Sequence, residues 1–354
     1  MEGLEKLVCE LVAIESVNPD LVPGGAGEAA IASFVAGWLR HAGCDVTVVE
    51  PVPGRPSVVG VVRGTGGGRS LMLNAHMDTV GAGGMKDPFL PEVRDGRVYG
   101  RGAYDMKGSL AAIMLAAREA ARERLRGDLV VCAVADEEVA SFGTSAVLKR
   151  FGADFAIVTE PTELRLCLAH KGFVWLEVET VGVTAHGSRA DIGVDAIALM
   201  GPVLMQVQDL SRRLLAGARH PLLGTGSVHA SLIEGGTELS TYPSRCVVKI
   251  ERRTIPGESG KDEIEGARVL LERAPSEMPA DHPLARAVSA AAGAPEEIGV
   301  PYWMDMALIN EAGIPCVCYG PSGGGEHADV EWVDLDSVEK CVEVYLRVAR
   351  RLCG

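Results

Sequence analysis

Aromatic side chains make up only 5% of this 354-residue chain, although apolar residues of all kinds make up 47%. A core of this size must therefore be filled mainly by Val, Ala, Leu and Ile. Basic residues are few beside acidic ones, and the formal net charge is −14. A nucleic-acid partner needs a basic surface to neutralise its phosphates, so this charge argues against nucleic-acid binding. It does not exclude a small anionic substrate, because one Arg can dominate the charge of a pocket.

Long apolar runs are also lacking, since none approaches the roughly 18 residues of a membrane span. The longest candidate, LAAIMLAA at 110–117, is followed by Arg118 and Glu119, which predicts a buried helix. The first residues, MEGLEKLVCELV, lack the basic start and long apolar core of a signal peptide. Nine cysteines at irregular spacing are not typical of a disulfide framework. These features predict a cytoplasmic protein with reduced cysteines and no membrane partner.

The pattern of strands and helices changes twice along the chain. Residues 1–171 alternate apolar strands with amphipathic helices, which predicts an α/β layered domain. Residues 172–281 predict a strand–helix–strand–strand–helix unit, with the second helix in the segment that begins PGESGKDEIEG. The α/β pattern resumes over 282–354 after a proline-rich stretch. We therefore expect one α/β domain interrupted by an inserted α+β domain.

Acidic residues and histidines recur in five segments, mostly at the ends of apolar runs that are typical of buried strands. They are His76 and Asp78 in LMLNAHMDTV, Asp105 in GRGAYDMKG, Glu137 and Glu138 in VADEEVAS, Glu160 in IVTEPT, and His327 in GGGEHADV. Converging carboxylates repel one another unless a cation lies between them, and burying them unpaired is costly. His with Asp or Glu, and no Cys nearby, suits a divalent ion such as Zn²⁺ or Co²⁺. The simplest interpretation is a metal site that holds two ions.

Each motif also has a simpler interpretation when it is taken alone. Asp78 lies two residues after His76, where a carboxylate can support a metal-bound imidazole, but a solvated loop explains the pair equally well. Asp105 before a helix is typical of an N-cap. Adjacent residues at a strand end point to opposite sides, so one of Glu137 and Glu138 can bind metal while the other acts as a general base. A Glu pair is nevertheless more often a solvated surface.

The ordered set of motifs resembles the zinc-dependent amidohydrolase family of acetylornithine deacetylase, succinyl-diaminopimelate desuccinylase, aminoacylase and glutamate carboxypeptidase. The motifs span nearly the whole chain and are AHMDTV, GRGAYDMKG, DEE, TEPT, TAHGS, ERRTIPGE, AGIPCVCYGP and EHADVEWV. The resemblance implies a three-layer α/β catalytic domain with a mixed, largely parallel sheet, made of 1–171 and 282–354. It implies that 172–281 form an inserted α+β lid domain through which the protein forms a homodimer.

The resemblance also implies which residues bind metal. Asp105 bridges two divalent ions, for which Zn²⁺ is expected and Co²⁺ or Mn²⁺ are the alternatives. His76 and Glu160 complete the ligands of one ion, and Glu138 and His327 complete those of the other. Asp78 supports His76, Glu137 is the general base and acid, and the Asp105–Met106 peptide is cis.

Two residues of the inserted domain are implied to act on the substrate. His186, in TVGVTAHGS, matches a histidine that reaches the partner subunit's site and binds the scissile carbonyl oxygen. Arg253, in ERRTIPGE, matches an arginine that holds the substrate carboxylate, and its neighbour Arg252 should point to the opposite face of the strand. The simpler interpretations are an exposed loop histidine and a surface charge. Ser240 and the segment 302–305 depart from the family pattern near the substrate, and therefore leave the substrate open.

We therefore expect a two-metal hydrolase that cleaves the amide bond of a small N-acyl amino acid. A carboxypeptidase or dipeptidase acting on short peptides is the alternative. In the family, Glu at the position of Glu160 accompanies acyl-group removal and carboxypeptidases, whereas Asp accompanies several di- and tripeptidases, so Glu160 favours deacylation. A metal-binding relative that has lost activity is the non-enzyme alternative. The presence of every ligand and of the base argues against it.

Overall fold

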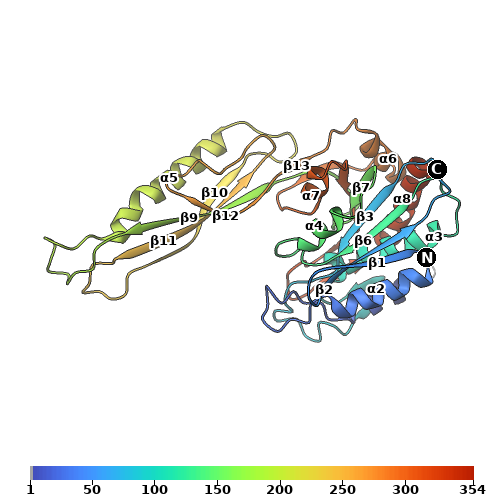
Figure 1. Cartoon of the computed structure of the whole chain (residues 1–354), viewed down its shortest axis with the longest axis horizontal. Coiled ribbons are helices and arrows are strands. Elements are labelled where there is room, and N and C mark those ends of the chain that lie inside the picture. Colours follow the sequence, from blue (N-terminus) through green and yellow to red (C-terminus); the bar gives the residue numbers. More distant parts are fainter. Residues whose placement is uncertain (1–2) are drawn as a thin grey trace. The chain divides into compact units, whose positions relative to one another are not determined.

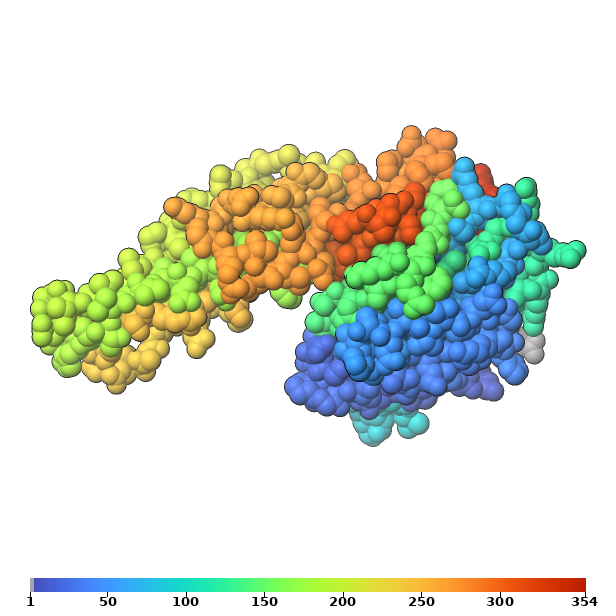
Figure 2. All heavy atoms as spheres, viewed as in Figure 1, coloured from blue at the N-terminus to red at the C-terminus, as the bar shows by residue number. Residues whose placement is uncertain are grey.

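The computed structural model describes residues 3–354 and divides into two compact units. Unit 1 contains Met1–Leu168, Met278–Ile298 and Met304–Gly354, and unit 2 contains Ala169–Glu277 and Gly299–Trp303. The chain thus leaves unit 1 and returns to it, so the blue N-terminal and red C-terminal segments belong to one body (Figure 2). Residues 299–303, which the sequence pattern places in the α/β domain, belong to unit 2 because Trp303 packs edge-on against His170 and Phe173.

The centre of unit 1 is a mixed sheet (Figure 1). Its strands follow the order β1 (Asp45–Val52), β2 (Arg55–Val62), β6 (Leu129–Val134), β3 (Leu71–His76), β7 (Phe155–Val158), β15 (Cys316–Cys318) and β8 (Leu166–His170), and β14 (Glu297–Val300) also pairs with β8. The pairs β6–β3, β3–β7 and β7–β15 are parallel. The pairs toward both ends of this order, β1–β2, β2–β6 and β15–β8, are antiparallel. The predicted α/β fold with a mixed sheet is confirmed, and its parallel part is the centre of the sheet.

Helices cover both faces of this sheet, which makes three layers. One group contains α1 (Leu4–Val12), α2 (Ala29–His41), α3 (Gly108–Ala120), α6 (Pro283–Ala292) and α8 (Leu335–Cys353), and the other contains α4 (Phe142–Leu148) and α7 (Met306–Glu311). Position 60 of β2 faces Leu39 of α2, whereas Ser57 faces Gly143 of α4, and these two strand positions point to opposite faces. Strands covered on both faces are apolar throughout, which explains the runs LMLNAH and LVVCAV.

The ends of the parallel strands gather the acidic motifs at one edge. His76 is the last residue of β3, Glu137 follows β6 and Glu160 follows β7. Because parallel neighbours end on the same side of a sheet, these three chain positions are brought together. A second, smaller sheet brings in the C-terminal motif, with the order β16 (Gly323–Gly324), β17 (Trp332–Asp334), β5 (Arg97–Tyr99) and β4 (Glu92–Arg94). Its pair β17–β5 joins the segment that follows His327 to the segment that precedes Asp105.

Unit 2 is an antiparallel sheet covered on one face by a long helix (Figure 1). The sheet has the order β10 (Ser227–Gly235), β11 (Arg245–Thr254), β9 (Gly172–Val181) and β12 (Arg268–Arg273), and the helix is α5 (Ala196–Ala216). The short strand β13 (Ser276–Glu277) follows β12 in sequence but pairs with the end of β8, at Ala169 and His170. Alternate residues of β9, such as Val174, Leu176 and Val178, pack with Met200 and Val203 of α5. These contacts give unit 2 a core of its own.

The predicted second helix of the inserted domain is wrong, because RVLLER forms strand β12 instead. Leu, Glu and Arg favour helices, but this preference amounts to fractions of a kcal/mol per residue. Pairing with β9 over Arg268–Arg273 satisfies the backbone of both strands and outweighs it. Gly266, with a φ of 73°, ends the preceding turn directly before the strand. Across residues 3–354, no helix combines the length and the apolar character that crossing a membrane requires.

Candidate metal centre

Asp105 faces two histidines through its two different carboxylate oxygens. Its Oδ1 lies 3.0 Å from His76 Nε2, and its Oδ2 lies 3.3 Å from His327 Nε2. The Asp105–Met106 peptide is cis, as expected. Helix α3 begins at Gly108 without a side-chain cap, so the N-cap interpretation of Asp105 is wrong. A carboxylate that presents one oxygen to each of two groups has the geometry of a bridging ligand.

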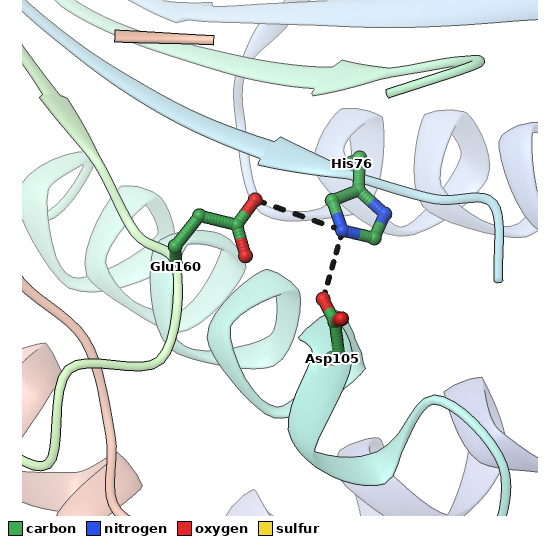
Figure 3. A group of neighbouring side chains, drawn as sticks. All are labelled: His76, Asp105 and Glu160. Atoms are coloured by element: carbon green, nitrogen blue, oxygen red, sulfur yellow. Dashed lines mark hydrogen bonds and ion pairs between the residues drawn. The ribbon is translucent and has the colours of Figure 1, made fainter. Parts of the chain in front are cut away.

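The predicted ligands form two groups that share Asp105. In the first, shown in Figure 3, Glu160 Oε1 lies 3.6 Å from His76 Nε2. In the second, Glu138 Oε2 lies 3.3 Å from His327 Nε2. Within each group the potential ligand atoms all lie within 4.8 Å of one another. In the first group His76 and Glu160 are buried at strand ends, and Asp105 is partly buried in the turn before α3, whereas the His327 side chain, in a loop, is 54% exposed.

The donor set fits divalent cations. Glu138 Oε1 is buried and, among residues 3–354, has no hydrogen-bond partner. Such an atom is costly to leave unpaired, and a cation would satisfy it. Two imidazoles with three carboxylates are ligands that Zn²⁺, Co²⁺ and Mn²⁺ accept. The residues present therefore fit a site for two divalent ions.

The charges in this centre shift pKa values in both directions. Burial would raise the pKa of Asp105, but hydrogen bonds from His327 and His76 outweigh it and hold the pKa below its usual range. Burial and the charge of Glu160 raise the pKa of Glu137 well above its usual range. Hydrogen bonds to Asp105 and Glu138 raise the pKa of His327 to about 10. The centre therefore has an excess of negative charge, which bound cations would offset.

Asp78 supports the centre differently from the expectation. The Nδ1 atom of His76 lies 2.9 Å from the backbone oxygen of Asp78, while the Asp78 carboxylate is 3.6 Å away. The carboxylate instead accepts the backbone N–H groups of Glu137 at 3.1 Å and Glu138 at 3.3 Å. Strand β3 ends at His76, so residue 78 lies beyond the regular alternation on which the expectation rested. Asp78 thus links the strand that carries one ligand to the turn that carries another ligand and the candidate base.

A buried polar network behind Asp78 was not predicted from the sequence. Asn18 donates through Nδ2 to Asp78 at 2.8 Å and to Asp136 at 3.0 Å. Arg55 forms ion pairs with Asp136 at 3.2 Å and with Glu28. The sequence signal that could have indicated this network is Asn18 in SVNPD, a polar residue directly before Pro19.

Asp305, in the segment that departs from the family pattern, is buried in unit 1. It accepts a hydrogen bond from Thr144 of α4, and burial raises its pKa to about 6. Its Oδ1 is buried without a hydrogen-bond partner among residues 3–354. The charge of Asp305 contributes to the raised pKa values of Glu137 and Glu160. The sequence identified this segment as a departure from the family pattern, but it did not predict that the Asp305 carboxylate influences Glu137 and Glu160.

His186 and Arg253 lie in unit 2 and belong to neither ligand group. His186 is exposed, and its Nδ1 lies 2.9 Å from Ser188 Oγ. The next residue, Gly187, donates its backbone N–H to Ser240 at 2.6 Å, so Ser240 holds the loop of this histidine. His186 is thus an accessible loop residue.

Arg253 is placed on the sheet face opposite to Arg252, as predicted. Arg252 is fully buried and pairs with Glu258 and Glu263. Arg253 donates through Nε to Glu251 at 2.7 Å, and its guanidinium lies 5.2 Å from the Phe173 ring centroid. This bond uses Nε and neither of the two terminal nitrogens of Arg253.

Comparison with known proteins assigns the family. The model of peptidase family M20/M25/M40 matches residues 72–351. This chain belongs to that family. It is 27% identical to acetylornithine deacetylase of Salmonella typhimurium, over 97% of this chain and 96% of that protein.

Solved structures show the same fold. A tripeptidase from Staphylococcus aureus superposes with a TM-score of 0.81 at 20% identity, covering 99% of this chain and 98% of that one. A dinuclear metal-binding peptidase of the M20 family from Bacillus subtilis gives a TM-score of 0.73 at 17% identity, covering 99% and 97%. The chain is therefore an M20-family hydrolase that acts on amide bonds, and not the inactive relative considered above.

Proposed function

We propose that this enzyme hydrolyses the amide bond of an N-acyl amino acid with the help of two divalent metal ions. Zn²⁺ is the ion we expect, and Co²⁺ or Mn²⁺ are alternatives. The observation that carries the proposal is the bridging geometry of Asp105, with one oxygen toward His76 and the other toward His327. Full-length similarity to an acetylornithine deacetylase, and Glu rather than Asp at position 160, favour a deacylase.

Each residue of the centre has a separate role in hydrolysis. Two divalent ions held by these ligands would acidify the attacking water and polarise the scissile carbonyl. Glu137 accepts the proton of the water as it attacks the acyl carbon, and then delivers that proton to the leaving amine. Asp78 keeps Glu137 in place through the backbone N–H.

Arg253 is proposed to hold the carboxylate of the amino acid through its terminal nitrogens, which can make paired hydrogen bonds. A peptide with a free C-terminus carries the same carboxylate, so a carboxypeptidase or dipeptidase remains the alternative. The peptidase structures with the same fold are consistent with either substrate. The discriminating feature is therefore the group on the nitrogen, which is an acyl group in one case and an aminoacyl group in the other.

We propose that the chain forms a homodimer through unit 2, in which His186 acts on the partner subunit's substrate. Strand β10 lies at an edge of the unit 2 sheet, and Leu232 and Ile233 on it are 65% and 55% exposed. Met205 of α5 is 53% exposed. An edge strand with apolar residues is suited to pairing with a second copy. We propose the cytoplasm as the location, because nine free thiols suit a reducing compartment.

A substrate panel tests this proposal. N-acetyl, N-succinyl and N-formyl amino acids are compared with dipeptides, each with and without a chelator, and metal content is measured by elemental analysis. We expect two equivalents of metal, chelator-sensitive hydrolysis and a preference for N-acyl amino acids. Faster cleavage of dipeptides would move the assignment to a peptidase. A metal content of zero at saturation would disprove the metal centre.

A further inference from the structure

The carboxylate of Glu331 accepts hydrogen bonds from the backbone of the turn that carries Asp105. Glu331 is 1% exposed and lies directly before β17. Its Oε1 accepts the backbone N–H groups of Tyr104 at 2.9 Å and Asp105 at 3.0 Å. Its Oε2 accepts the backbone N–H of Gly102 at 3.0 Å and Arg101 Nη1 at 2.7 Å. One buried side chain therefore satisfies three backbone donors and one guanidinium.

This arrangement determines where the Asp105 backbone lies. Charge-assisted hydrogen bonds to a carboxylate are short and strong, and four of them on one group hold it in a single position. The backbone N–H of Asp105 itself is among the donors, so a movement of Glu331 would displace the residue that bridges the two ligand groups. Gly102 adopts a φ of 78°, which lets its N–H share Oε2 with Arg101.

The same cluster also holds the His327 loop. Arg101, which is 1% exposed, donates through Nη2 to the backbone oxygen of Ala328 at 2.8 Å. Ala328 is the residue after His327, whose φ of 61° places it in a left-handed turn. Glu331 and Arg101 therefore connect the two ligands of the second group that come from loops, Asp105 and His327. Neither residue belongs to a ligand group.

We propose that Glu331 is a positioning residue that sets the distance between Asp105 and His327, and thereby the affinity of the second ion. The inference rests on the proposed two-metal function. The first group depends less on Glu331, because His76 and Glu160 are held at strand ends that Glu331 does not contact. Because both groups share Asp105, the predicted consequence is an asymmetric loss of affinity, larger for the ion bound by Glu138 and His327 than for the ion bound by His76 and Glu160.

The test is a Co²⁺ titration of metal-free protein, followed by calorimetry and by the visible absorption of bound Co²⁺. In Glu331→Gln the amide nitrogen cannot accept a hydrogen bond. Whichever way the side chain turns, either the Arg101 and Gly102 pair or the Tyr104 and Asp105 pair is therefore lost. We expect the second ion to bind about 10–100-fold more weakly, the usual effect of removing a residue that orients metal ligands, and the first ion to be weakened by a clearly smaller factor. His327→Ala identifies which binding event belongs to the second group.

Asp128→Asn is the matched control. Asp128 also pairs with an arginine, Arg63 at 2.8 Å, and with a backbone N–H, that of Gly64 at 2.8 Å, but it contacts neither ligand turn. It should bind both ions as the wild type does. Arg101→Lys provides a second variant if Glu331→Gln fails to fold. It keeps a cation beside Glu331 but cannot reach both partners, and should weaken the same binding event by a smaller factor.

Unchanged binding of both ions in Glu331→Gln would overturn the inference, because Glu331 would then position neither ligand group. Equal weakening of both ions would also overturn it, because Glu331 would then act on the fold in general. If Glu331→Gln does not fold, the same two results in Arg101→Lys overturn it. A wild type that binds fewer than two ions overturns the proposed function instead, and this inference with it. The metal content of the wild type therefore separates the two failures.

Discussion

The carboxylate of Asp78 accepts the backbone N–H of Glu137 at 3.1 Å. This bond joins the end of β3 to the turn after β6, so the candidate base and the strand that carries His76 are held as one element. Asp78 therefore acts on the base through the backbone as well as on the imidazole. The Asn18 amide donates to the other oxygen of Asp78 at 2.8 Å and fixes the orientation of the carboxylate.

Asp78→Asn should lower kcat by about 10–100-fold, the range for losing a residue that orients an active group. The amide nitrogen cannot accept a backbone N–H, so one of the bonds to residues 137 and 138 is lost. Steady-state kinetics and metal content give the measurement. Asp154→Asn is the control, because Asp154 also accepts a backbone N–H, that of Ser70 at 2.7 Å, on a loop that contacts no ligand. Wild-type kcat in Asp78→Asn would show that the bond has no catalytic role.

Glu137→Gln should retain both metal ions and lose at least about 100-fold in kcat, the scale of general base catalysis. The amide has nearly the same size but cannot take a proton at neutral pH. Glu138→Gln, one residue away, should weaken metal binding as well, because Glu138 lies in a ligand group. Elemental analysis and turnover of the two variants are compared directly. Retention of more than about a tenth of the activity in Glu137→Gln would show that another group is the base.

A mixture of His186→Ala and Glu137→Gln chains should regain activity that neither variant has alone. If His186 serves the partner subunit, a mixed dimer contains one site with both groups intact. Activity is followed after subunit exchange, with exchange verified by differently tagged chains. A mixture that exchanges subunits but recovers nothing would argue that His186 acts within its own chain or not at all.

Arg253→Ala should lose roughly 2–4 kcal/mol of transition-state binding, the scale of breaking a buried charge pair, with metal content intact. Arg253→Lys should restore only part of it, because Lys cannot make paired hydrogen bonds. The measurement is kcat/KM for an N-acyl amino acid and for its C-terminal amide. Equal efficiency of the wild type on both compounds would contradict carboxylate recognition. Glu251→Gln removes the negative charge beside Arg253 and should lower KM for the acid only.

The stability of the metal-free protein should depend on His170 between pH 4 and 6.5. Burial lowers the pKa of His170 from 6.5 to about 4. The unfolded state therefore binds more protons in this range, and the contribution of His170 to stability is present above pH 6.5 and lost as the pH falls toward 4. The full change is about 3 kcal/mol. Urea unfolding at several pH values should show a shallower dependence in His170→Phe, while the exposed His41→Gln keeps the wild-type dependence. Identical slopes in wild type and His170→Phe would refute this.

The sequence by itself determined the α/β class, the inserted unit and the set of candidate ligand residues. Continuous apolar runs such as LMLNAH predict strands covered on both faces, and carboxylates or imidazoles at their ends have few other uses in a core. The cis peptide after Asp105 also followed from the resemblance of GRGAYDMKG to its family. These features are local motifs or depend on the order of motifs along the chain, and both can be recognised in a sequence.

Only the tertiary structure decided which groups support those ligands. The strand β12 formed because β9 offered an edge to pair with, which outweighed the helical preference of RVLLER. Asp78 turned its carboxylate to the 137–138 turn because β3 ends at His76 and the alternation of side chains stops there. Glu331 met the Asp105 turn across 226 residues of sequence through the pairing of β17 with β5. Such contacts depend on where backbone donors lie in space, and residue types along a chain do not specify that position.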